Sequence, residues 1–79
     1  MNEKIEELKS LLEEEIAVLV SVTYDPMYFG IYVKIRSGIL QDFNFKMYDD
    51  WFMEMSTKII ANRIIKEFRK YVNDYFFNK

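Results

Sequence analysis

Residues 50–78 read DWFMEMSTKIIANRIIKEFRKYVNDYFFN, and this stretch predicts one long helix around which the rest of the chain is organised. No Gly or Pro interrupts it, and its apolar residues recur at the three- and four-residue spacing of one helical face. That face comprises Ile60, Ile64, Ile65, Phe68, Tyr71, Val72 and Tyr75. Asp49 and Asp50 stand where an N-cap is expected, because a carboxylate there accepts free backbone N–H groups and favours the positive end of the helix dipole.

The register of this predicted helix, Asp50–Asn78, changes near Ser56. Phe52, Met55 and Ile59 project to a neighbouring face from the stripe that follows. Either the helix is broken and Ser56 caps a second segment, or it is continuous and turns its second face to a partner. A continuous helix would span about 42 Å, against about 26 Å for an eight-residue strand, and would therefore overhang its own sheet.

The chain before this helix passes from helical to strand periodicity. An apolar stripe of Ile5, Leu8, Leu11 and Leu12 predicts an N-terminal helix. Three stretches then alternate apolar with polar residues, as half-buried strands do, and Asp25-Pro26 and Ser37-Gly38 separate them. The predicted inward positions are Val18, Val20, Val22 and Tyr24 in the first strand, Phe29, Ile31, Val33 and Ile35 in the second, and Ile39, Phe43, Phe45 and Met47 in the third. The order α-β-β-β-α predicts an α+β fold, a three-stranded antiparallel meander packed on two helices, with residues 1–79 forming a single domain.

The composition predicts self-association. The chain has 79 residues, of which 51% are hydrophobic and 18% aromatic, more apolar side chain than so small a monomer readily buries. The aromatic end of the long helix lies beyond the reach of a short sheet, so we expect a homodimer or a protein partner to cover it. The predicted interface residues are Ile65, Phe68, Tyr71, Val72, Tyr75 and Phe76. Of the methionines, Met47, Met53 and Met55 are expected in the core, and Met27, after Pro26, as an exposed contact.

Charge is distributed unevenly along a chain whose net charge is −2. Residues 1–27 carry two lysines against seven acids, and residues 58–79 carry six basic residues against two acids. The two ends are therefore expected to lie side by side, or the basic end faces a polyanion. A small nucleic-acid-binding protein is the alternative function. Its predicted contacts are Tyr32, Lys34, Arg36 and Lys46 on the solvent face of the sheet and Arg63, Lys66 and Lys70 on the last helix, although acids interrupt both sets.

The residue types present exclude several kinds of chemistry. The absence of His and Cys removes the usual zinc ligands, thiol nucleophiles and imidazole bases. Gly30 and Gly38 each stand alone, so no loop of the P-loop kind is predicted, and we expect no enzyme, no metal and no cofactor. The absence of cysteine, an acidic N-terminal segment and the shortness of the run Ile16–Val20 predict a cytoplasmic protein that does not enter a membrane.

The element order also resembles two known groups of proteins. Double-stranded RNA-binding domains share the order α-β-β-β-α, but they open their last helix with lysines, whereas residues 49–54 here read DDWFME, which argues against RNA. In length and element order the layout also resembles small phage inhibitors of CRISPR nucleases. That resemblance implies a viral or mobile-element protein that occludes a host protein, in the host cytoplasm if viral. We therefore predict a non-enzymatic interaction protein with a regulatory or inhibitory role.

Overall fold

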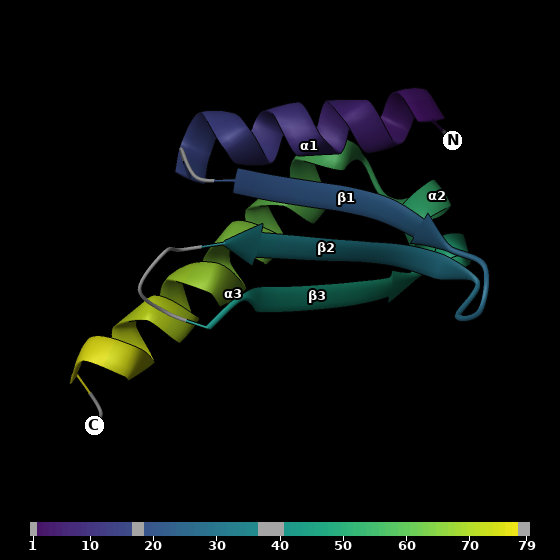
Figure 1. Cartoon of the computed structure of the whole chain (residues 1–79). Coiled ribbons are helices and arrows are strands. Elements are labelled where there is room, and N and C mark those ends of the chain that lie inside the picture. Colours follow the sequence, from purple (N-terminus) through teal and green to yellow (C-terminus); the bar gives the residue numbers. More distant parts are fainter. Residues whose placement is uncertain (1, 17–18, 37–40, 78–79) are drawn as a thin grey trace.

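A computed structural model of the chain describes residues 2–16, 19–36 and 41–77, which form two layers (Figure 1). The elements in chain order are α1 (Asn2–Ile16), β1 (Leu19–Asp25), β2 (Gly30–Arg36), β3 (Phe43–Tyr48), α2 (Asp49–Glu54) and α3 (Thr57–Phe77). Both strand pairs are antiparallel and the sheet order is β1-β2-β3. The predicted α+β meander is therefore confirmed, with one more helical segment than the two helices predicted. The predicted turn at Ser37-Gly38 and the inward positions Val18 and Ile39 lie outside the described residues.

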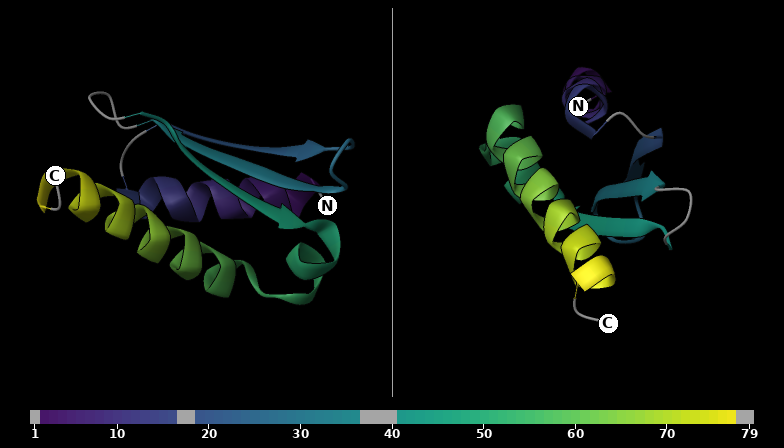
Figure 2. Two further views of the ribbon diagram at one scale, coloured as in Figure 1. Left: turned by 90° about the horizontal axis from the view of Figure 1, so that it is seen from below. Right: turned by 90° about the vertical axis from the view of Figure 1, so that its left-hand side faces the viewer.

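The helices cover one face of the sheet, and no described element covers the other (Figure 2). Alternation along the strands points Val20, Val22, Ile31, Val33, Ile35 and Met47 into the core, as predicted. The register pairs Ile31 with Met47 and Val22 with Val33, so these inward residues form adjacent rows beneath the helices. The uncovered face is called the open face below.

The helical layer supplies the other half of the core. It contributes Ile5, Leu8 and Leu12 from α1 and Ile60, Ala61, Ile64, Ile65 and Phe68 from α3, so the predicted stripe of α1 and the earlier part of the predicted stripe of α3 are confirmed. The two helices pack against each other, which places the acidic and basic ends of the chain side by side as expected (Figure 2). The ion pair between Arg69 and Glu15, 3.3 Å long, joins them across the surface.

The predicted long helix is broken near Ser56. Helix α2 ends at Glu54, Met55 is extended, and α3 begins at Thr57. The Ile59 N–H donates to the Ser56 hydroxyl oxygen at 3.3 Å, which satisfies one of the free donors at the start of α3. The interpretation with a second, serine-capped segment is therefore confirmed, and the continuous helix is wrong.

Helix α1 holds both sides of this break. The Lys4 ammonium donates to the carbonyl oxygens of Met53 at 3.2 Å and Met55 at 2.7 Å, at the negative end of α2. The hydroxyl of Thr57, a buried residue, donates to the Glu7 carboxylate, which lies at the positive end of α3. Because Lys4 and Glu7 are three residues apart, they share one face of α1, so a single helical turn binds the end of one helix and the start of the next.

Two details of the start of α2 and of the core differ from the sequence prediction. Asp49 and Asp50 lie in the first turn of α2 and do not cap it, because the helix begins directly after β3 and Tyr48 takes the cap position without a side-chain hydrogen bond. Their charges still favour the helix dipole. Met53 is 53% exposed and not in the core, because α2 turns the side chain of Phe52 inward and that of Met53 outward.

Candidate protein-interaction site

Four large side chains are exposed together at the end of the sheet where β1 turns into β2. Met27, Tyr28 and Phe29 form the turn, and Tyr48 stands at the adjacent end of β3 (Figure 1). Their exposed fractions are 85%, 56%, 68% and 74%. These four residues are called the hairpin-end patch. Groups of exposed large apolar side chains are a feature of interaction sites.

The hairpin-end patch is held by backbone hydrogen bonds. The Met27 N–H donates to the Asp25 carboxylate at 2.9 Å and the Tyr28 N–H donates to the Asp25 carbonyl at 3.2 Å, which closes the turn. Phe29 has a φ of 52°, a left-handed conformation that is rare for a bulky residue. The Asp49 N–H fixes it by donating to the Phe29 carbonyl at 2.9 Å. The prediction that Phe29 is an inward strand residue is therefore wrong, because the turn includes it and directs its ring to solvent.

A hollow of about 290 Å³ lies beside the patch. Its lining residues, which define the tyrosine hollow, are Asp25, Tyr28, Gly30, Ile31, Tyr32, Lys46, Met47 and Tyr48. Gly30 pairs with both Asp25 and Tyr48, so it lies in the sheet between two other lining residues. The hollow is near the lower end of the size range of small-ligand sites, and three of its eight lining residues are tyrosines.

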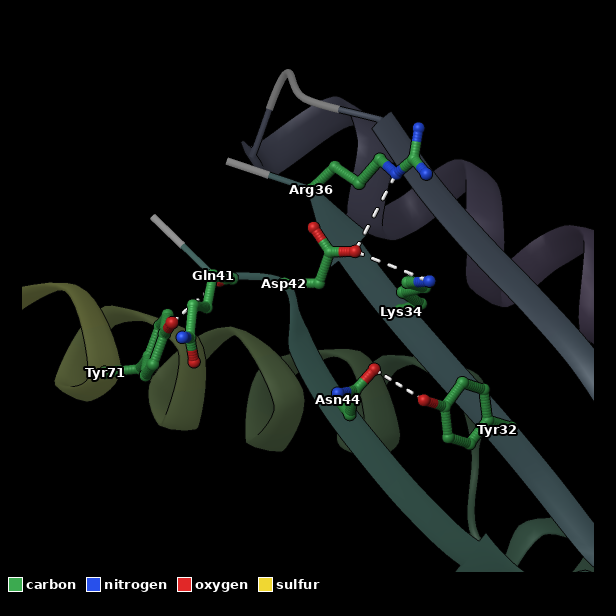
Figure 3. A network of polar contacts seen from close by, with 7 residues as sticks. All are labelled: Tyr32, Lys34, Arg36, Gln41, Asp42, Asn44 and Tyr71. Carbon is green, nitrogen blue, oxygen red and sulfur yellow. Dashed lines mark hydrogen bonds and ion pairs between the residues drawn. The ribbon is translucent and has the colours of Figure 1, made fainter. Parts of the chain in front are cut away.

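Lys46 lies against two of the tyrosine rings. Its ammonium is 4.0 Å from the centre of the Tyr28 ring and 5.4 Å from that of Tyr32, which are cation–π distances. The Tyr32 hydroxyl in turn donates to the Asn44 side-chain oxygen at 2.6 Å (Figure 3). These contacts orient the rings before any partner arrives.

The structure divides the predicted nucleic-acid contacts between two surfaces. Tyr32, Lys34, Arg36 and Lys46 lie together on the open face, as predicted from strand alternation. Asp42 lies 3.4 Å from the Lys34 ammonium and 3.8 Å from the Arg36 guanidinium, so one acid faces both cations (Figure 3).

The second surface is the outer side of α3. Arg63 lies 5.4 Å from the Trp51 ring centre, whereas Lys66 and Lys70 line a depression that Glu15 and Glu67 share. Acidic residues therefore lie beside the cations on this surface too. The core separates this surface from the open face of the sheet.

The predicted interface residues fall into a buried group and an exposed group. Ile65 and Phe68 are 6% and 8% exposed and belong to the domain's own core. Tyr71 and Val72 pack partly against that core; the Tyr71 ring lies 5.5 Å from that of Phe43 and its hydroxyl donates to the Gln41 carbonyl at 2.7 Å (Figure 3). Tyr75 and Phe76 are exposed, with ring centres 5.3 Å apart, and Phe77 beside them is also exposed. Because the broken helix lies across the sheet, the domain itself covers the earlier part of the stripe.

Sequence reasoning identified Met27 as an exposed contact, and Tyr32 and Lys46 as polar-face residues, but missed Tyr28, Phe29 and Tyr48. A signal for two of them was present, since MYF directly follows Pro26 and precedes Gly30. In the part of the chain that the structure describes, no group of acidic residues could hold a metal ion. No described helix combines the length and hydropathy needed to cross a bilayer. Comparison with protein families, curated proteins and solved structures finds no match to this chain.

Proposed function

We propose that this chain is a non-enzymatic binding protein that attaches to a protein partner through the hairpin-end patch and regulates or inhibits that partner by covering part of its surface. The observation that carries this proposal is the grouping of Met27, Tyr28, Phe29 and Tyr48, each more than half exposed, beside the tyrosine hollow. The absence of His and Cys supports a non-enzymatic role. The small size and element order support a viral or mobile-element protein that acts in the host cytoplasm.

The energetics favour this patch as a contact surface. Burying one large apolar side chain contributes about 1.5–3 kcal/mol, and exposed aromatic residues held in place are typical of interface hot spots. The hydrogen bonds to the Asp25 carboxylate and the Phe29 carbonyl already order the turn, so less conformational entropy is lost on binding. Tyr32, Lys34, Arg36 and Lys46 on one face favour nucleic acid as the rival ligand, but Asp42 weakens that case.

Removing two rings of the hairpin-end patch is expected to weaken partner binding at least tenfold, roughly the effect of 1.4 kcal/mol. Phe29→Asn suits the turn, because Asn tolerates the left-handed conformation, and Tyr48→Ser removes the second ring. The partner is first captured from host lysate with the wild-type protein, then purified and titrated by calorimetry. Leu19→Ser, at the far end of β1 and equally exposed, is the matched control and should bind like wild type. Unchanged affinity in a double variant with native circular dichroism would refute the proposal.

We also propose that the chain forms a homodimer through the end of α3, where Tyr75, Phe76 and Phe77 are exposed. Figure 1 shows these last turns extending beyond the strands, so the sheet does not reach them. Light scattering at tens of micromolar should give about twice the 9.7 kDa chain mass for wild type, and a folded monomer for Phe76→Glu combined with Phe77→Glu. These sites are better probes than Tyr71, whose ring and hydroxyl are engaged inside the domain. A wild-type monomer at that concentration would contradict the dimer.

A further inference from the structure

We propose that the tyrosine hollow recognises an acidic side chain of the protein partner next to an aromatic or aliphatic one, with Lys46 as its ionic contact. This inference rests on the proposed function and specifies the chemistry of the partner's contacting segment. Its ligand is one carboxylate attached to an apolar body, as in an Asp or Glu beside a large apolar residue.

The rings of the hollow already hold a cation. Tyrosine ring faces attract positive charge, which is why an empty cluster of three tyrosines would be expected to bind an ammonium group. Here the Lys46 ammonium lies over Tyr28 and Tyr32 at 4.0 and 5.4 Å. An incoming cation would have to displace Lys46, whereas an incoming anion would meet its unused N–H donors.

Lys46 also differs from the other cations of the open face. Lys34 and Arg36 are paired with Asp42. The ion pairs found among residues 2–16, 19–36 and 41–77 do not include Lys46. A carboxylate bound there would form a charge-assisted hydrogen bond with the Lys46 ammonium, and the tyrosine rings would contact its apolar body.

One acid of the lining works against an anionic ligand. Asp25 lies at the edge of the hollow, but its Oδ1 accepts the Met27 N–H, which ties the carboxylate to the turn. The negative charge of Asp25 can be used to test whether the ligand is an anion or a cation. Asn at this position keeps the accepting oxygen and removes the charge, so it should strengthen an anionic ligand and weaken a cationic one.

The dimensions favour a protein side chain over a nucleic acid. A hollow of about 290 Å³ has room for one large side chain or ring. Nucleic-acid affinity grows with the number of phosphates neutralised, and on this face the single Asp42 carboxylate offsets part of the positive charge of Lys34 and Arg36. One available ammonium suits one carboxylate.

The test is a titration of the isotope-labelled protein, followed by the backbone amide signals of Gly30 and Tyr48. The probes are 3-phenylpropionate, its neutral amide, the cationic 3-phenylpropylamine and a dT12 oligonucleotide. We expect the carboxylate to bind at least about fivefold more tightly than the amide, because only it accepts a charge-assisted hydrogen bond. In Lys46→Met, the carboxylate and the amide should bind with equal affinity. Asp25→Asn should tighten carboxylate binding about twofold to threefold, because it removes a nearby negative charge. Lys58→Met, on α3, is the control and should leave the affinity for every probe unchanged.

Several results would overturn the inference. The amine binding most tightly would mean that the hollow is a cation cage, and equal binding of amide and carboxylate to wild type would make it a purely apolar site. Stronger shifts with dT12, lost in Lys34→Met, would assign the face to nucleic acid, and no shift with any probe would leave the hollow without a ligand of this class. A purified partner protein that no longer binds the double variant Phe29→Asn, Tyr48→Ser but still binds Lys46→Met with wild-type affinity would refute this inference alone. The proposed function would then still stand.

Discussion

Replacing Gly30 with alanine is expected to lower the free energy of unfolding by about 3 kcal/mol or more. A Cβ at this position would stand 2.2 Å from the Met47 carbonyl oxygen and 3.2 Å from the Tyr48 Cα. These are backbone atoms of β3, and they have no rotamer by which to move aside. Gly30 is in the central strand, paired with Asp25 on one side and Tyr48 on the other, so it has little room to shift either. Glycine is required here by the close approach of two strands.

Urea denaturation of the wild type and the Gly30→Ala variant measures this loss. A chain of this length has a total stability of roughly 4–12 kcal/mol, so the variant should be partly unfolded at moderate denaturant concentrations. Ser21→Ala, at an exposed position of β1, is the matched control and should stay within about 0.5 kcal/mol of wild type. A loss below 1 kcal/mol for Gly30→Ala would show that the backbone of β3 moves aside easily and would contradict this prediction.

Replacing Phe52 with alanine is expected to cost about 3–5 kcal/mol, the usual cost of removing a fully buried phenylalanine. Phe52 is 0% exposed and is among the largest buried side chains. It reaches the core from the short helix α2, and the Lys4 ammonium lies 5.1 Å from its ring centre while bonding the carbonyls at the end of α2. Truncation would therefore leave a cavity directly under the joint between α1, α2 and the sheet.

The neighbouring residue provides the control for this prediction. Met53→Ala changes an exposed side chain one position along the same helix, and its effect should stay within about 0.5 kcal/mol. Thermal and urea unfolding of both variants give the comparison. Similar losses of stability at the two positions, or a larger loss at Met53, would mean that α2 does not turn Phe52 toward the core and Met53 toward solvent.

The hairpin-end patch shows where sequence reasoning about the site succeeds and where it stops. The exposed position of Met27, and the shared open face of Tyr32 and Lys46, follow from a turn after Pro26 and from strand alternation. The sequence does not indicate that Tyr48 stands beside Tyr28, because that neighbourhood depends on the pairing of Gly30 with Tyr48 across two strands. The interface residues illustrate the same difference. Ile65 and Tyr75 occupy one predicted stripe, yet the core takes the first and leaves the second exposed.

Periodicity in the sequence by itself determined the antiparallel meander and most of the inward positions of the strands and helices, because spacings of two and of three or four residues are local properties of the chain. Only the tertiary structure decided the break near Ser56. A serine and a change of register permit either a continuous or a divided helix. The contacts that support the divided form come from Lys4 and Glu7, which lie 49 to 51 residues away and meet the break only after α1 has packed on α3. That packing places a cation at the end of one helix and a carboxylate at the start of the next, where the two helix dipoles favour them.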